Sequence, residues 1–258
     1  MIETGDEARL PTTIGGLVDL AFAGYLERAP LYLGLALAAF ALQAAVEFAL
    51  PAWKVGTQEG TIKELTLIFL SLLTDSVVIA AVALGIATRV AGKTAPPRSI
   101  AAATASRWGA AFIANLFGSI VVLSTAQFGA VGPLPDPPAI LLLTAPLCWI
   151  VWGTLSLAPP IAALSPERAA FAAMHGITRA VTLSFHRSNL VRLCIVAFAS
   201  IVPVMLQTIL SDPRFHVTRD FWINVPIDAL TVGPLAALQT VFALDFARRA
   251  GVLSAPRE

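Results

Sequence analysis

Charge is scarce in this chain. Only 13% of its 258 residues are charged, whereas 57% are hydrophobic. An ordinary soluble domain carries about a quarter charged residues, so this composition excludes that class and is typical of an integral membrane protein. The formal net charge is +1. Nucleic-acid binding needs a strongly basic surface, so we expect no nucleic acid as a partner.

Cysteine is scarce as well. The chain has two, Cys148 and Cys194, both within apolar runs and without the spacing of a disulfide framework or a zinc knuckle. The sequence also lacks an HExxH motif, a glycine-rich phosphate loop, a P-loop lysine and a nucleophile elbow. We therefore expect no catalytic residue, no metal and no cofactor, and we interpret the chain as non-enzymatic.

Long apolar runs, by contrast, are abundant. A membrane-spanning helix needs about 20 predominantly apolar residues. Six stretches qualify, namely residues 30–50, 65–90, 108–131, 139–164, 190–210 and 226–247. Pro146 in the fourth and the Gly233-Pro234 pair in the sixth predict kinks or breaks. The expected fold is all-α, a single polytopic membrane domain over residues 1–258 with about six transmembrane helices.

The basic residues are distributed unevenly between the two sides of these spans. If the amino terminus is cytoplasmic, four of the 17 lysines and arginines fall in outer segments and the other 13 in inner segments. The outer four are Lys54, Lys63, Arg214 and Arg219. Because positively charged loops remain in the cytoplasm, we expect both termini to be cytoplasmic. The opening MIETGDEARL is acidic where a signal peptide is basic, so we expect no cleavage there.

The segment RAAFAAMHGITRAVTLSFHR, residues 168–187, combines charge with apolar side chains. Ser165 as a cap and Pro166 in the first turn predict a helix over residues 165–187. At about 100° per residue, one face carries a basic stripe of Arg168, His175, Arg179 and His186, and another carries Phe171, Met174, Ile177, Val181 and Phe185. This pattern is typical of an amphipathic helix in the cytoplasmic interface. The stripe either binds anionic lipid headgroups or is the solvated face of a connector that fixes topology.

Two other segments resemble this one. Residues 12–28 keep the apolar rhythm of an amphipathic helix, and residues 98–108 form a weaker third example. Each would precede an odd-numbered span on the inner side. The order suggests three loosely similar units of interfacial helix plus hairpin.

Three stretches carry a family resemblance. They are GGLVDLAFAGYLERAPLYLGLAL, APPIAALSPERAAFAAMHGITRAVTLSFHRSNLVRLCIVAF and LAALQTVFALDFARRAG. Their arrangement resembles the membrane domain of glycerophosphoryl diester phosphodiesterases and its stand-alone bacterial relatives. The resemblance implies a multi-pass fold in the bacterial inner membrane and transfers no catalytic residue. Ala162, Ala163 and Leu244 depart from it, since the family often has an acidic residue and a tyrosine at these places.

Polar residues within the spans are candidate functional groups, because a central charge costs about 2.5 to 3.5 kcal/mol on insertion scales. Asp75 lies mid-span in LLTDSVVIA, beside Thr74 and Ser76. It is either a proton or cation carrier or a hydrogen-bonded structural group. Gln43 and Glu47 form a polar notch near the outer end of the first span, where Glu47 also has the interface within reach.

Other polar residues are expected to join helices. Asn115 and Gln239 are predicted to make interhelical hydrogen bonds. Asp245 lies three and four residues before Arg248 and Arg249, a spacing that predicts ion pairs on one helix face.

Three functional hypotheses follow. The chain is a scaffold or a lipid- or envelope-associated partner, a transporter that uses intramembrane carboxylates, or an accessory membrane domain for a separate hydrolase. Membrane lipids are the expected partners, together with a second copy or another membrane protein. A transporter requires Asp75 to face a wet cavity with partners such as Asn115 or Gln239, whereas a scaffold allows Asp75 to be dry and capped by Thr74 or Ser76.

Overall fold

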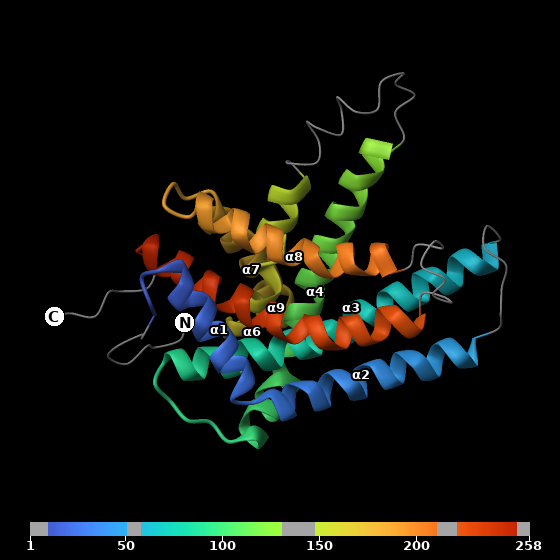
Figure 1. The fold of residues 1–258 in the computed structure, drawn as a ribbon, viewed down its shortest axis with the longest axis horizontal. Helices are drawn as coiled ribbons and strands as arrows, with labels where there is room; N and C mark the ends of the chain where they lie inside the picture. The colour runs from blue at the N-terminus through green and yellow to red at the C-terminus, as the bar shows by residue number, and fades with distance from the viewer. Residues whose placement is uncertain (1–9, 51–57, 131–147, 211–220, 252–258) are drawn as a thin grey trace.

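Helices make up all the regular structure in the part of the chain that the structure, a computed structural model, describes. That part comprises residues 10–50, 58–130, 148–210 and 221–251 (Figure 1). The helices are α1 (Ile14–Leu26), α2 (Ala29–Ala49), α3 (Gln58–Val90), α4 (Pro97–Ala130), α6 (Ala158–Leu164), α7 (Ala169–Ser184), α8 (Leu190–Leu210) and α9 (Phe221–Arg249). The all-α prediction is confirmed.

Three of the described helices are long and apolar enough to cross a membrane. Their apolar portions are Ala29–Val46 in α2, Leu65–Val90 in α3 and Ala229–Arg249 in α9. Shorter apolar helices cover Ile14–Leu26, Cys148–Leu164 and Leu190–Ser200. The six predicted spans stay a prediction.

Some predicted boundaries agree with the structure and others do not. The helices α2 and α8 lie within a residue of their predicted bounds, and α1 falls inside residues 12–28. The predicted separate helix at residues 98–108 is wrong, because those residues belong to α4. Pro97 starts α4 with a preset backbone angle, and the alanine-rich stretch after it contains no residue that would end a helix.

The fourth apolar run breaks at a place that the sequence did not predict. Residues 148–155 are helical, and α6 begins at Ala158 after a turn at Ser156 and Leu157. Pro159 and Pro160 occupy the first turn of α6, where their missing N–H groups cost no helical hydrogen bond. Pro146 lies outside the described residues. The predicted break at Gly233 and Pro234 is wrong, since α9 continues through both, and the alternative of a kink there stays a prediction.

The start of α7 also differs from its prediction. The helix begins at Ala169 with Arg168 at the cap position, and Ser165 is extended with ψ 136°. Pro166 explains this difference, because the residue before a proline is pushed out of the helical region. Arg107 of α4 then donates to the carbonyl oxygens of Ser165 and Glu167, the latter at 3.2 Å. These contacts hold the connection between α6 and α7 against α4.

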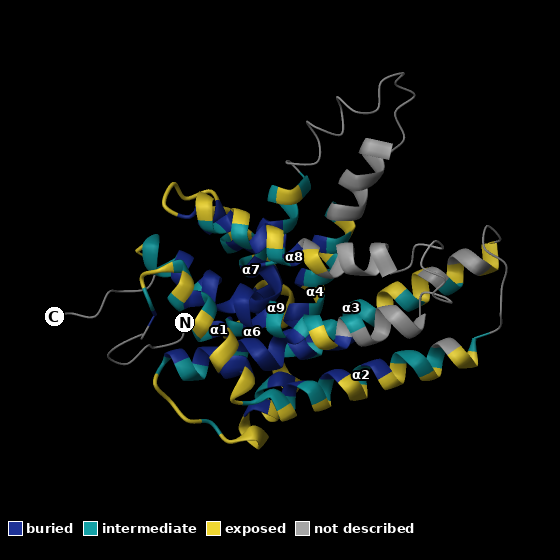
Figure 2. Ribbon diagram, viewed as in Figure 1, coloured by how far each residue is buried: buried dark blue, intermediate teal, exposed yellow. Residues whose placement is uncertain are grey.

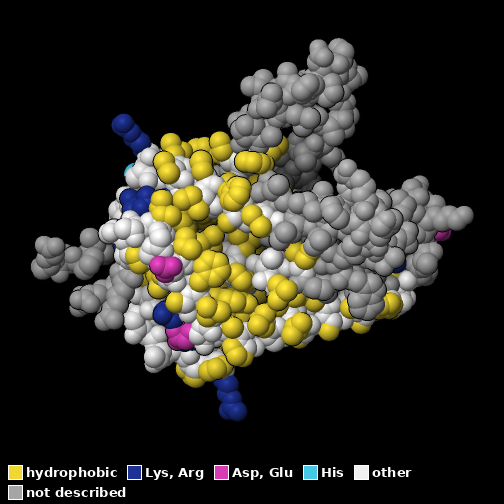
Figure 3. Space-filling model, in the orientation of Figure 1, with side chains coloured by type: hydrophobic (Ala, Val, Ile, Leu, Met, Phe, Trp, Pro, Cys, Tyr) yellow, Lys and Arg dark blue, Asp and Glu magenta, His cyan; other side chains and the backbone are white. Residues whose placement is uncertain are grey.

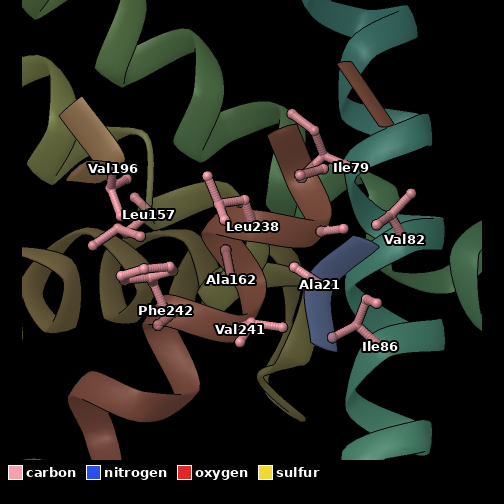
Figure 4. Packing of buried hydrophobic residues seen from close by; sticks show 14 of the residues in the cluster. Ala21, Ile79, Val82, Ile86, Leu157, Ala162, Val196, Leu238, Val241 and Phe242 are labelled. Atoms are coloured by element: carbon pink, nitrogen blue, oxygen red, sulfur yellow. The ribbon is translucent and has the colours of Figure 1, made fainter. Parts of the chain in front are cut away.

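The core forms where α9 packs against its neighbours (Figures 2 and 4). Val241, Phe242 and Phe246 of α9 are fully buried. Around them lie side chains of α1, α3, α6 and α8, including Ala21, Ile86, Ala162 and Val196. Alanine and glycine are frequent at these contacts, so the helix backbones approach closely.

One such approach yields a stability prediction. A Cβ on Gly176 of α7 would lie 2.8 Å from the Ala158 carbonyl oxygen and 2.9 Å from the Ala162 nitrogen. Backbone atoms cannot move aside alone, so Gly176→Ala should destabilise the protein by about 1 to 3 kcal/mol. Thermal unfolding in detergent measures this change. Gly34→Ala in α2 is the matched control, because no described atom lies within 4 Å of its Cβ position. Equal stability of the two variants would contradict the packing.

A buried charge cluster ties α9 to two other parts of the chain. The Asp245 carboxylate is fully buried. It pairs with Arg248, with Arg249 at 2.8 Å and with Arg192 of α8 at 3.1 Å. The predicted pairs with Arg248 and Arg249 are confirmed, and Arg192 adds a partner that sequence spacing did not show. We call these four residues the Asp245 cluster.

The arginines of the Asp245 cluster also hold the segment before α1. Arg248 donates to the carbonyl of Pro11 at 2.9 Å, and Arg192 donates to that of Thr12 at 3.0 Å. The start and the end of the described chain therefore meet at one end of the bundle. Asn189 adds a further link, because its Nδ2 lies 2.9 Å from the Leu183 carbonyl and 3.4 Å from that of Phe246.

Neutralising the carboxylate should loosen this end of the bundle. Asp245→Asn leaves three guanidinium groups without their counter-charge, and breaking a buried ion pair costs about 3 to 5 kcal/mol. We expect a lower unfolding temperature in detergent and faster proteolysis before α1. Asp19→Asn, at an exposed position of α1, controls for loss of an acid. An Asp245→Asn protein as stable as wild type would show that the cluster contributes little.

Candidate functional site

A cavity of about 390 Å³ lies inside the bundle. It is bounded by α3, α4, residues 148–160, α8 and α9. Its apolar lining comes from Ile68, Leu72, Ile79, Gly118, Leu155, Pro159, Val232 and Leu235. Its polar lining comes from Asp75, Asn115, Ser119, Trp152, Ser156, Ser200, Thr231 and Gln239. A mostly apolar cavity with a few converging polar groups is the usual form of a small-molecule site, and its volume falls in the usual range.

Three predicted residues meet in this cavity. Asp75 comes from α3, Asn115 from α4 and Gln239 from α9, and all three line it. They are separated by 40 and 124 residues in sequence. The structure therefore brings Asp75 and the two amides to one cavity, as the transporter hypothesis expects, and water in that cavity stays a prediction.

The two amides are held in place by hydrogen bonds between helices. Asn115 Nδ2 donates to Ser76 Oγ at 3.3 Å and reaches the Leu72 carbonyl at 3.4 Å. Gln239 Nε2 donates to Ser200 Oγ at 3.3 Å, which lies 3.3 Å from Ser156 Oγ. The predicted interhelical hydrogen bonds of Asn115 and Gln239 are confirmed. They join α3 to α4, and α9 to α8 and the helical segment before α6.

The hydroxyl groups beside Asp75 have other acceptors. Thr74 donates to the Ser71 carbonyl at 2.9 Å, and Ser76 donates to the Leu72 carbonyl at 2.5 Å. Each hydroxyl has one proton to donate, and here the backbone of α3 accepts it. Both hydroxyls therefore bond to the backbone of their own helix, and the alternative in which Thr74 or Ser76 caps the carboxylate stays a prediction.

Sequence reasoning missed part of this lining. Trp152, Ser156, Ser200 and Thr231 line the cavity without having been candidates. The sequence did contain an indication, because hydroxyl groups and an indole within apolar runs are polar groups whose burial in a membrane costs free energy. Small hydroxyls satisfy themselves on their own helix, as Ser156 does on Gly153 at 2.9 Å. For that reason a hydroxyl within an apolar run is a weaker indication of a functional site than a carboxylate.

The polar notch predicted at Gln43 and Glu47 is only partly described. Gln43 is half-buried on α2 and does not line the cavity. The side chain of Glu47 lies outside the described residues. Among the described residues, no group of three histidines, cysteines or acids is placed to hold a metal ion.

The basic stripe lies on α7 and the turn after it, away from the cavity lining. Arg168 and His186 are exposed, and Arg179 is half-buried. His175 Nδ1 lies 2.9 Å from Glu167 Oε1, and His186 Nδ1 lies 2.8 Å from Ser188 Oγ. Both histidines contact neighbouring side chains in the sequence. The positive charge of the stripe that has no such local contact therefore comes from its arginines.

Water access to Asp75 distinguishes a cavity that is open to solvent from one that is sealed. We expect infrared difference spectra of the protein in lipid nanodiscs, recorded on exchange of H₂O for D₂O, to show a carboxyl band that shifts in D₂O. Asp75→Asn should remove this band, whereas Asp19→Asn should leave it. Identical H₂O/D₂O difference spectra for wild type and Asp75→Asn would show that the carboxyl is closed to solvent.

Comparisons with known proteins found no match to this chain. No protein-family model, no curated protein and no solved structure matches it. The resemblance to the membrane domain of glycerophosphoryl diester phosphodiesterases stays a prediction, and the function is argued from the geometry of the described residues.

Proposed function

We propose that this chain is a non-enzymatic, six-span membrane protein that binds a small organic cation inside its helical bundle and carries it across the membrane. The observation that supports the proposal is the cavity in which Asp75, Asn115 and Gln239 meet. An acidic residue on an apolar helix is costly, and such residues typically mark ion or substrate pathways.

The lining favours a cation with apolar surface. Asp75 contributes a carboxylate, and no lysine or arginine is among the described residues that line the cavity. Trp152 contributes an indole, the side chain that best attracts an organic ammonium ion through its ring face. The remaining lining is largely aliphatic and suits alkyl groups, while the amides and hydroxyls suit hydrogen-bonding substituents.

The membrane orientation rests on where the charges lie. In Figure 3, hydrophobic side chains cover the middle of the visible face, and charged side chains lie around it, at the left, at the bottom and at the right edge. Several contacts link predicted inner segments to one another, as Arg89 does with Glu27 and Arg192 does with Thr12. This arrangement supports cytoplasmic termini in a bacterial inner membrane. Accessory action for a separate hydrolase stays a prediction that no contact favours.

Binding of a tetraalkylammonium ion tests the proposal. Wild-type protein in nanodiscs should bind tetraethylammonium in calorimetric titration. Trp152→Leu should weaken binding by about 5- to 30-fold, the equivalent of 1 to 2 kcal/mol of cation–π attraction. Asp75→Asn should weaken it by more than about tenfold, because the counter-charge is lost. Trp149→Leu is the matched control, since Trp149 is 44% exposed and does not line the cavity.

The binding results distinguish a cation site from its absence. Specific loss in Trp152→Leu and Asp75→Asn supports the cation site, and uptake of the same ion into proteoliposomes then tests transport. Absence of binding by wild type, or an equal loss in Trp149→Leu, would contradict the proposal.

A further inference from the structure

Helix α7 presents three different faces. Helix α7 packs against α6 and α4. Its buried residues are mostly small, namely Ala172, Ala173, Gly176, Ala180 and Ser184, and Leu183 is the one large residue among them. Large apolar residues were the natural candidates for this contact, yet most of them point away from it. The packing of α7 on the bundle is therefore already satisfied, and its other two faces are open for another partner.

The second face is apolar and exposed. Phe171 is 70% exposed, Met174 64%, Phe185 57% and Val181 42%. At about 100° per residue these four side chains fall within one quadrant of the helix. Four large side chains on one exposed face would be unfavourable in water, since burying each is worth about 1.5 to 3 kcal/mol.

The third face carries the charge and borders the apolar one. Arg168 and Arg179 lie about a quarter turn from the centre of the exposed apolar face. Neither side chain makes a hydrogen bond or salt bridge within the part of the chain that the structure describes. Between residues 165 and 189 the sequence has three arginines and one acid, Glu167. That acid faces His175 at 2.9 Å, so the segment keeps an excess of positive charge.

We propose that α7 lies in the plane of the inner leaflet and binds anionic phospholipids. In this arrangement Phe171, Met174 and Phe185 enter the acyl-chain region, and Arg168 and Arg179 contact headgroup phosphates. The two arginines are three turns apart, about 16 Å along the helix, so each contacts a different headgroup. This inference is independent of the cavity, because no residue of α7 lines it.

Lipid retention measured by native mass spectrometry tests the charged face. Wild-type protein from membranes with equal phosphatidylglycerol and phosphatidylcholine should retain mainly phosphatidylglycerol. R168Q/R179Q should lower this preference by about tenfold to thirtyfold. K93Q/R98Q is the matched control, because it removes two exposed basic residues from the same predicted side. Undiminished preference in R168Q/R179Q, or an equal loss in the control, would overturn the proposal.

A spin label tests the apolar face and requires no loss of charge. Met174→Cys, in a chain whose Cys148 and Cys194 are serine, should carry a nitroxide that is accessible to oxygen and shielded from a nickel chelate. The same label at Lys93→Cys, in the exposed turn between α3 and α4, should show the reverse. A label at position 174 that the nickel chelate reaches freely would show that α7 lies outside the bilayer.

Discussion

The buried carboxylate of Asp245 is the interaction on which the arrangement of this bundle depends. Desolvating an ion costs several kcal/mol, and here three arginines offset that cost. The N–H groups of these arginines that are not bound to Asp245 donate hydrogen bonds to main-chain carbonyl oxygens before α1. One charge therefore fixes α9 relative to α8 and to the amino-terminal segment. Gln239 and Thr231 lie on the same rigid helix, so their positions in the cavity follow from this anchor.

A second constraint keeps the cavity polar inside an apolar bundle. Each amide that lines it is tied to a neighbouring helix, Asn115 to Ser76 and Gln239 to Ser200. The hydrogen bonds are long, at 3.3 Å, and the partners are small hydroxyls. A network of this kind positions the groups without closing the space between them. Asn115 and Gln239 are thereby held beside Asp75 in the lining of one cavity.

The sequence predicted what depends on local spacing and missed what depends on tertiary contact. The bounds of α2 and α8 follow from runs of apolar residues, and the Arg248 and Arg249 pairs follow from spacing on one helix. Arg192 completes the same cluster from another helix, which no local pattern shows. The late start of α7 depends on Pro166 and on the hydrogen bonds from Arg107. The cavity depends on the relative orientation of five segments. Asp75 was identifiable because an acid in an apolar run is conspicuous, whereas Ser200 was not.

The cavity and α7 are connected through one short helix. Pro159 of α6 lines the cavity, and Ala158 and Ala162 of the same helix leave no room for a Cβ on Gly176 of α7. Close-packed interfaces transmit displacement, because their atoms cannot be compressed. A movement of α7 must therefore move α6 or separate the two helices. By thermodynamic linkage, a lipid that favours one position of α7 would also change the affinity of the cavity, and a bound cation would change the affinity for that lipid.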